Sequence, residues 1–306
     1  MDRIDKLIIM DLLQNCRLSY QALARKHGIT LNAIKKRIHK LLSDGVFEFC
    51  IEPNVAMFDG DWAIALIKTN GTENQMSFIN ELGSNRMINE VGTLSDSGYI
   101  IYAVYSGLEG FAEFNKYLRS LNPVVNIEVH QILMNRGPKL ELTKKQVHVL
   151  HAIIDDPRMQ LSTIADRTGL SAKTVRRILN ELIEDTGIWF GSRLHLNSTD
   201  GVSFLVRVGW DENQSQLPDV LEWLSTEFSD EYWFPLISVN SPIIFAVFMV
   251  AKIKDINVVI EKLRKSPLLT SASAIMGSQS HSFYDLRRYW LEEKFIETGL
   301  PPTLNE

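Results

Sequence analysis

SYQALARKHGITLNAIKKRIHKLLSDG, residues 19–45, is the stretch that decides the fold. It predicts a short helix, a turn at Gly28, which can adopt the positive φ that ends a helix, and a second helix capped by Thr30. In that second helix the apolar residues recur at helical spacing, at Ile34, Ile38, Leu41 and Leu42, with basic residues between them. The pattern is that of a helix-turn-helix unit, whose second helix enters the DNA major groove. A helical hairpin with a solvated charged face would give the same pattern.

The chain repeats this pattern 141 residues later. DLLQNCRLSYQALARKHGITLNAIKKRIHKL, residues 11–41, aligns without a gap with AIIDDPRMQLSTIADRTGLSAKTVRRILNEL, residues 152–182. The shared positions are Arg17 with Arg158, Ala24 with Ala165, Gly28 with Gly169, Thr30 with Ser171, and Leu41 with Leu182. Thr143 and Gln146 add a capping box before the second copy. The repetition of the turn and the cap favours two helix-turn-helix domains over a helical hairpin with a solvated charged face.

Length and composition limit the class of protein. With 306 residues, 45% hydrophobic and 23% charged, the chain predicts several globular domains. Cys16 and Cys50 provide neither a disulfide framework nor zinc spacing. The apolar run 243–251 is too short to cross a bilayer, and the N-terminus is unlike a signal peptide. We therefore expect a cytoplasmic protein without membrane contact, metal or cofactor, and we find no catalytic triad, phosphate loop or dinucleotide motif.

The charge is unevenly distributed. The net charge is −5, but residues 1–50 hold nine Lys and Arg against five Asp and Glu, and residues 138–195 hold nine against seven. The positive charge therefore lies in the two predicted helix-turn-helix domains, where phosphate contact requires it. The acidic remainder would keep non-specific affinity for DNA low.

A segment with the element order βαββαβ follows each copy. The first has strands at 62–69, 87–94, 99–105 and 124–133 and helices at 75–82 and 108–121, with a turn at 95–98. The second has strands at 202–209, 232–239, 243–250 and 268–276 and helices at 217–228 and 253–265, with a turn at 240–242. This order predicts two ferredoxin-like domains. An amphipathic helix at 283–297 has no counterpart in the first half.

These observations predict an α+β protein with two winged helix-turn-helix domains alternating with two ferredoxin-like domains. The predicted boundaries are 1–54 and 138–198 for the helix-turn-helix domains, 55–137 and 199–280 for the ferredoxin-like domains, and 281–306 for the C-terminal helix and tail. Asn135-Arg136-Gly137-Pro138 marks the junction between the halves.

The chain resembles a tandem-duplicated member of the Lrp/AsnC (feast/famine) transcription regulators. The residues that carry the resemblance are Asp5, Ile9, Leu12, Arg17, Leu23-Ala24, Gly28, Ile34, Arg37-Ile38, Leu41 and Gly45-Val46. The second copy departs from the pattern in having Ile178 where the first has Arg37. Gly98-Tyr99 fits the family's turn between the middle strands, but Ile100-Ile101 follows it, and the second half has Asn240-Ser241-Pro242.

The resemblance implies a non-enzymatic, sequence-specific DNA-binding regulator that presents two unequal recognition helices per chain. It also implies ferredoxin-like domains that assemble homo-oligomers, dimers or higher, and an amino-acid effector. The partner is double-stranded DNA, and the two differing helices predict an asymmetric site. Half-sites of such two-fold dimers lie roughly one helical turn, ~34 Å, apart.

Helical spacing places the candidate DNA-binding residues on the outer faces of the two recognition helices. In the first copy we assign base edges to Thr30, Asn32, Ala33 and Lys36, and phosphates to Lys35, His39 and Lys40. Arg37 lies nearer the core and is either a phosphate clamp or a structural ion pair. In the second copy the candidates are Ser171, Lys173, Thr174, Arg176, Arg177 and Asn180. Glu181, Glu184 and Asp185 would weaken phosphate contact there.

Two other functions stay open. Siroheme decarboxylases resemble the same family in fold, and some form double-length chains, but they carry a histidine-bearing aromatic stretch where this chain has FDGDWAIALI and STDGVSFLVRV. A metabolite sensor with vestigial DNA-binding domains is the other alternative. His130, His148 and His151 are interpreted as packing or surface residues, since His148 and His151 lie one helical turn apart with no acid or cysteine ligand nearby. The tryptophans are interpreted mostly as core or interface residues.

Overall fold

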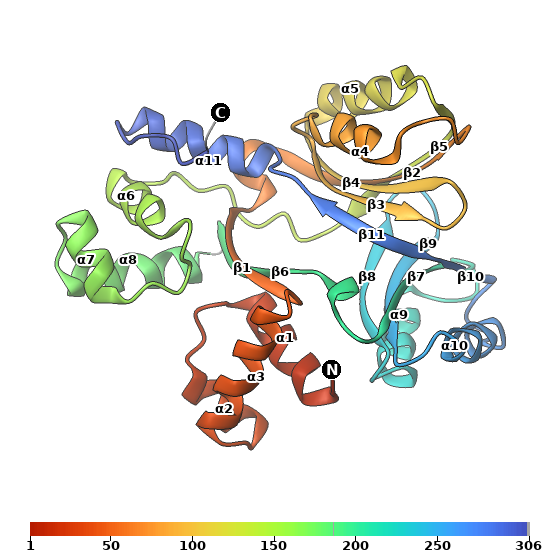
Figure 1. Ribbon diagram of the computed structural model, residues 1–306, viewed down its shortest axis with the longest axis horizontal. Coiled ribbons are helices and arrows are strands. Elements are labelled where there is room, and N and C mark those ends of the chain that lie inside the picture. Colours follow the sequence, from red (N-terminus) through yellow and green to blue (C-terminus); the bar gives the residue numbers. More distant parts are fainter. Residues whose placement is uncertain (186, 305–306) are drawn as a thin grey trace. The chain divides into compact units, whose positions relative to one another are not determined.

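The computed structural model describes residues 1–185 and 187–304 and divides into two compact units (Figure 1). The helical unit comprises Met1–Gly60, Arg136–His195 and Leu286–Glu306. The sheet unit comprises Asp61–Asn135 and Leu196–Asp285. Segments from both halves of the sequence therefore meet within each unit.

The helical unit contains two three-helix domains and the C-terminal helix. The first domain consists of α1 (Arg3–Gln14), α2 (Tyr20–His27) and α3 (Leu31–Ser43). The second consists of α6 (Lys144–Ile153), α7 (Leu161–Thr168) and α8 (Ala172–Glu184), and α11 (Leu286–Glu297) completes the unit. Both predicted glycine turns are confirmed, since Gly28 has φ +65° and Gly169 has φ +66°. These positive values are ones that residues with a Cβ rarely adopt.

One strand follows each three-helix domain, and the two strands pair with each other. β1 (Phe47–Pro53) and β6 (Ile188–Leu194) form an antiparallel ribbon. The sequence did not predict this pairing. Cys50 lies opposite Gly191, and these two positions are 141 residues apart, the spacing of the repeat. The ribbon is therefore symmetric about its own centre, and each domain completes the wing of the other.

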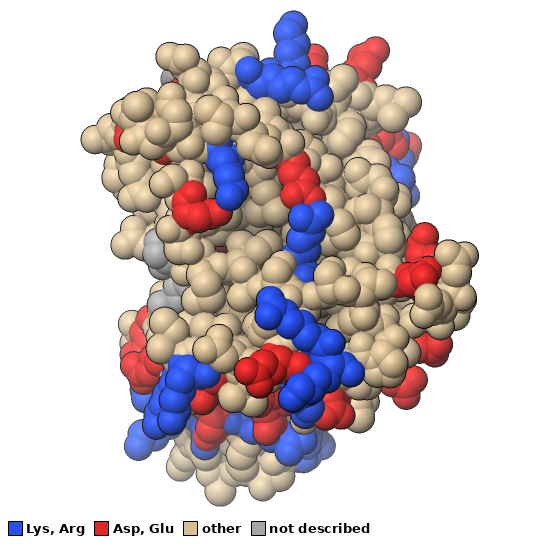
Figure 2. Space-filling model, turned by 90° about the vertical axis from the view of Figure 1, so that its right-hand side faces the viewer, with Lys and Arg blue, Asp and Glu red and all other residues tan. Residues whose placement is uncertain are grey.

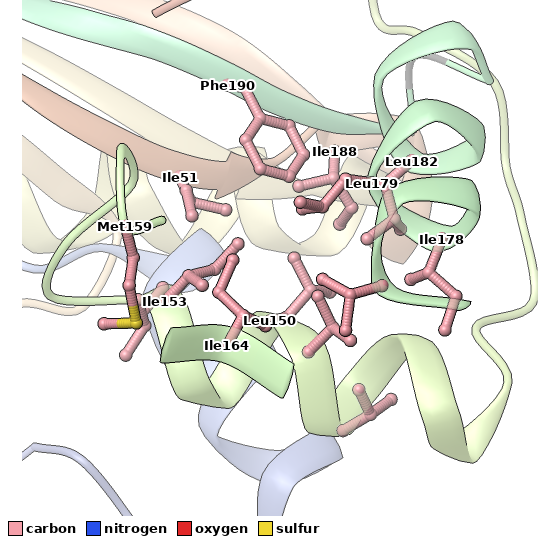
Figure 3. Close-up of a cluster of buried hydrophobic side chains, with 14 of the residues drawn as sticks. Ile51, Leu150, Ile153, Met159, Ile164, Ile178, Leu179, Leu182, Ile188 and Phe190 are labelled. Atoms are coloured by element: carbon pink, nitrogen blue, oxygen red, sulfur yellow. The ribbon is translucent and has the colours of Figure 1, made fainter. Parts of the chain in front are cut away.

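The second three-helix domain shares its core with this ribbon. Its apolar side chains come from α6, α7 and α8 and meet Ile51 of β1 and Phe190 of β6 (Figure 3). Leu291 and Phe295 of α11 belong to the same cluster and are fully buried. The burial of these apolar side chains stabilises the domain, since each contributes roughly 1.5–3 kcal/mol.

The sheet unit consists of two βαββαβ repeats. The first has the elements β2 (Gly60–Thr69), α4 (Gln75–Gly83), β3 (Ile88–Leu94), β4 (Gly98–Ser106), α5 (Gly107–Ser120) and β5 (Val124–Leu133). The second has β7 (Val202–Gly209), α9 (Leu217–Glu227), β8 (Tyr232–Ser238), β9 (Ile243–Val250), α10 (Asp255–Arg264) and β10 (Ser271–Ile275). Each repeat has the strand order 4-1-3-2 of a ferredoxin-like fold, so the predicted α+β fold class is confirmed.

The two repeats form one nine-stranded antiparallel sheet, in the order β10-β7-β9-β8-β5-β2-β4-β3-β11. β5 joins β8 through the pairs Ile132 with Ser238 and Leu133 with Ile237. At this junction the buried His130 ring contacts Ser238 Oγ at 2.9 Å and Glu128 Oε1 at 2.8 Å. His130 is therefore a packing residue within a hydrogen-bonded network.

The C-terminal helix begins three residues later than predicted. Residues 277–282 form β11 (Gly277–Ser282), which pairs with β3, and the Phe283 N–H donates to the Asn89 carbonyl. The Phe283 ring lies where a Cβ on Gly83 would stand, so its side chain packs into the sheet unit. The strand predicted at 268–276 is correspondingly shorter, and the last predicted tail residues, 305–306, lie outside the described part.

Two short 3-10 helices complete the structure, Val55–Phe58 and Leu196–Ser198. Within the described residues, no helix has the length and apolar character needed to span a membrane. The same residues hold no group of three His, Cys, Asp or Glu side chains that could bind a metal ion.

Candidate DNA-binding surface

Local capping fixes the start of the first recognition helix, α3. Thr30 Oγ1 accepts a hydrogen bond from the Ala33 N–H at 3.2 Å, as the sequence predicted, and Ser19 caps α2 in the same way. Ile34, Ile38 and Leu41 are buried under the helix. The first turn of α3 is therefore held at the end of the domain, where a recognition helix contacts bases.

The predicted DNA-contacting side chains of α3 lie on its outer face. Asn32, Lys35, Lys36, His39 and Lys40 are exposed, as is Thr30, whereas Ala33 is half-buried. Among the described residues, no carboxylate forms an ion pair with Lys35, Lys36 or Lys40. This face is therefore a cluster of cations whose charge is available to phosphates.

Arg37 differs from its neighbours because it is held within the domain. Its Nη1 lies 2.7 Å from Asp2 Oδ2 and 2.7 Å from Asp5 Oδ1, and the side chain is 30% exposed. Hydrogen bonds to Asp5 and Asp2 raise the pKa of Arg37. The geometry favours the structural ion pair over the phosphate clamp, the two roles considered for this residue.

The second recognition helix, α8, has the same capping but a different outer face. Ser171 Oγ accepts from the Thr174 N–H at 3.2 Å and contacts the Thr174 hydroxyl at 2.9 Å. Ser171, Lys173, Arg176, Arg177 and Asn180 are exposed, and Thr174 is half-buried. Arg177 forms an ion pair with Glu181 one turn away. Fewer cations are therefore available to phosphate on α8 than on α3.

A reciprocal arginine contact joins the two three-helix domains. Arg17 donates to the carbonyls of Pro157 and Met159, the latter from Nη2 at 3.0 Å. Arg158 donates to the carbonyls of Cys16 and Leu18, the latter also at 3.0 Å. These six positions are related by the 141-residue spacing, so the contact is symmetric. The sequence analysis missed this role, although the coincidence of Arg17 with Arg158 was the available signal.

Charges of both signs lie close together on the face of the molecule that Figure 2 draws. On the face drawn in Figure 2, Lys and Arg side chains lie beside Asp and Glu, separated by broad areas of uncharged residues. Mixed signs of this kind give a weak local field, because opposite charges cancel over short distances. The α3 face, with Lys35, Lys36 and Lys40 exposed, is the candidate surface for contact with nucleic acid.

Both three-helix domains match known helix-turn-helix families. Residues 1–42 match the AsnC-type helix-turn-helix domain family, and residues 142–185 match a winged helix-turn-helix DNA-binding family. An uncharacterized HTH-type transcriptional regulator of Pyrococcus furiosus is 39% identical over 75 residues, which are 24% of this chain and 51% of the relative. One of Pyrococcus abyssi is 26% identical over 125 residues, 40% of this chain and 81% of the relative. The match to the first relative thus spans about half its length.

A solved structure covers almost the whole chain. The siroheme decarboxylase NirDL has a TM-score of 0.57 and 14% identity over 97% of this chain and 99% of its own. At that identity the likeness concerns the fold alone. The AsnC-type match of residues 1–42 confirms the resemblance to the Lrp/AsnC family, and the winged helix-turn-helix match of residues 142–185 confirms a second helix-turn-helix segment in the same chain.

Proposed function

We propose that the chain is a sequence-specific, DNA-binding transcription regulator of the Lrp/AsnC type. The observation that carries the proposal is the outer face of α3, where Lys35, Lys36 and Lys40 are exposed and lack ion pairs within the described residues, in a domain matched by the AsnC-type family. Phosphate contacts of this kind supply much of the affinity for DNA.

We assign Thr30, Asn32, Ala33 and Lys36 to base edges, and Lys35, His39 and Lys40 to phosphates. On α8 the assigned residues are Ser171, Lys173, Thr174, Arg176, Arg177 and Asn180. Because the two sets differ in sequence, the proposed operator is asymmetric. The segments 1–54 and 138–198 read DNA, 55–137 and 199–280 carry assembly and effector response, and 281–306 forms the C-terminal helix and tail.

Gel-shift titrations with genomic fragments test this proposal. Lys36→Ala and Arg177→Ala should each weaken the shift, the first more strongly, whereas Lys252→Ala, an exposed lysine of the sheet unit, serves as the matched control. If neither substitution weakens binding, a metabolite sensor with vestigial helix-turn-helix domains is the better interpretation. Selection of a strict palindrome from random DNA would contradict the asymmetric operator. Adding amino acids to the titration tests the effector response.

The whole-chain likeness to NirDL supports a second candidate, an enzyme of the siroheme decarboxylase type. NirDL has been crystallised with an iron-uroporphyrin III analogue. Titration of the purified chain with an iron porphyrin separates the two functions. A saturable change in the Soret absorbance would favour the enzyme, and an unchanged spectrum together with a gel shift would favour the regulator.

A further inference from the structure

The two three-helix domains contact the β1–β6 ribbon in different ways. On the side of the first domain, α1 packs directly against β6. On the side of the second domain, α11 packs against both β1 and α6 (Figure 1). The pairing register of the ribbon is symmetric, so this difference arises from the side chains that the two strands carry and from the elements packed against them.

Three hydrogen bonds between β6 and the end of α1 hold that end in place. Trp189 Nε1 donates to the Leu13 carbonyl at 2.8 Å, and Ser192 Oγ donates to the Leu12 carbonyl at 3.2 Å. The Cys16 N–H donates to the Phe190 carbonyl at 2.8 Å. The first domain is thereby fixed to the ribbon at three points.

The repeated sequence removes all three donors on the opposite side. The positions equivalent to Trp189 and Ser192 are Glu48 and Ile51, and neither side chain has an N–H or O–H donor at neutral pH. Pro157 stands in place of Cys16 and lacks a backbone N–H. The end of α6 therefore cannot be held to β1 by the bonds that hold α1 to β6.

α11 supplies the missing attachment. Leu291 and Phe295 are buried in the core of the second domain, and the Phe295 ring meets the His151 ring edge-on at 5.0 Å between centroids. Arg287 forms an ion pair with Glu52 Oε2, while the other oxygen of that carboxylate lies 2.6 Å from Arg193 Nη2. The helix thus joins α6 to β1 through both apolar and ionic contacts.

We propose that α11 is a positioning element that holds the second recognition helix away from the two-fold position set by the ribbon, and so fixes the separation of the two half-sites read on DNA. Only the statement about half-site separation on DNA rests on the proposed function. The arrangement of α3 and α8 is a property of the chain alone. Packed helices lie ~8–10 Å apart, so an added helix on one side is large enough to change half-site spacing.

The arrangement can be measured without DNA. Spin labels on His39→Cys and Asn180→Cys occupy exposed, equivalent positions of the two recognition helices. Burial raises the pKa of the Cys16 thiol to about 11 and that of Cys50 well above its ordinary value, so the native cysteines react slowly with the label. Electron–electron double resonance then gives the distance between the two helices in the full chain.

Phe295→Ala and Arg287→Met should each shift or broaden this distance distribution by several ångströms, an amount set by helix packing distances. Glu293→Ala is the matched control, since Glu293 is an exposed residue of α11 and forms no ion pair within the described part of the chain. If Phe295→Ala unfolds the protein, Arg287→Met still provides the test. Glu52 keeps its ion pair with Arg193 in that variant, so we expect the variant to fold. Distributions that match the control in both variants would overturn the proposal.

Selection of bound sequences from random DNA tests the consequence for DNA. The variants should retain the half-site sequences of the wild type but accept a changed or wider range of half-site spacings. An unchanged spacing would contradict the role of α11 in DNA reading. If the wild type selects no sequence at all, the proposed function fails, while the distance measurement still decides the role of α11 within the chain.

Discussion

The two helix-turn-helix domains reach the same fold with different chemistry at three linked positions. In the first domain Asp2 and Asp5 form the capping box of α1 and also bind Arg37 of α3. In the second domain the equivalent residues are Thr143, Gln146 and Ile178. Thr143 and Gln146 keep the capping box without charge, and Ile178 is buried. The contact between the first and third helices can thus be ionic or apolar, provided that all three positions change together.

The outer faces of the two recognition helices differ in how many of their cations are free of ion pairs. α3 presents three lysines that lack ion pairs within the described residues, whereas α8 pairs Arg177 with Glu181 and continues into Glu184 and Asp185. The first domain therefore uses its internal charge for an ion pair between α1 and α3, and its outer charge remains available for the proposed DNA contact. In the second domain, the buried Ile178 takes the place of the internal ion pair, and Glu181 neutralises part of the outer positive charge.

The largest expected effect is on DNA affinity. Replacing Lys35, Lys36 and Lys40 together by Ala should weaken binding about 100-fold and reduce the salt dependence by nearly two counterions, since Lys35 and Lys40 are assigned to phosphates and each phosphate contact contributes ~0.9 to the slope. The equivalent α8 variant, Lys173→Ala with Arg176→Ala and Arg177→Ala, should lose only about tenfold. Fluorescence anisotropy at several salt concentrations measures both. Equal losses would remove the distinction between the helices.

The next effect concerns the symmetric arginine contact. Arg17→Ala should lower the free energy of unfolding by about 2–4 kcal/mol, because two carbonyls lose a charged donor. Arg158→Ala should cost at least as much, since its guanidinium also lies 4.6 Å from the centroid of the Tyr20 ring. Urea denaturation measures the change, with the exposed Arg25→Ala as the control. A pair of variants as stable as this control would show that the contact does not join the domains.

A smaller effect should distinguish the ionic core from the apolar one. Arg37→Ile alone should lower the free energy of unfolding by about 1 kcal/mol, because it leaves two carboxylates without their cation. Adding Asp2→Thr and Asp5→Gln should restore most of that loss by reproducing the chemistry of the second domain. Thermal unfolding of the single and triple variants tests this coupling. If the triple variant is as unstable as the single one, the three positions are independent.

The same ion pair should make stability depend on acid pH. Burial acts to raise the pKa of Asp2, but hydrogen bonds from the Asp5 N–H and Arg37 outweigh it, so this pKa lies below the ordinary 3.8. The stabilisation is therefore complete above pH 3.8 and is lost as the pH falls through the lower folded value. The melting temperature of the wild type should fall more than that of the Arg37→Ile variant below pH 4. Parallel curves would exclude a contribution from Asp2.

The smallest effect should come from releasing Arg177. Glu181→Gln removes the partner of this arginine and one negative charge beside the DNA-facing side of α8. We expect a two- to fivefold gain in affinity, in line with the ~1 kcal/mol or less that exposed ion pairs contribute. Anisotropy at low salt would detect it, and Glu222→Gln on α9 in the sheet unit is the control. A loss of affinity would show that Glu181 orients Arg177 for DNA.

The sequence by itself determined the local structure of this protein. The helix-turn-helix pattern, the caps at Thr30 and Ser171, the turns at Gly28 and Gly169, and the order of strands and helices in both ferredoxin-like repeats depend on residues close together in the chain. Short-range periodicity and capping chemistry fix these features, and the structure has them where the sequence places them.

Only the tertiary structure decided how the repeated parts combine. The pairing of β1 with β6, the exchange of hydrogen bonds between Arg17 and Arg158, and the attachment of α11 to Glu52 all join residues more than a hundred positions apart. A seven-residue strand or a repeated arginine carries no local signal for its distant partner, because the partner is chosen by the shape and burial of whole domains. The exposed lysines of α3 were visible in the sequence, but the frame that sets their position relative to α8 was not.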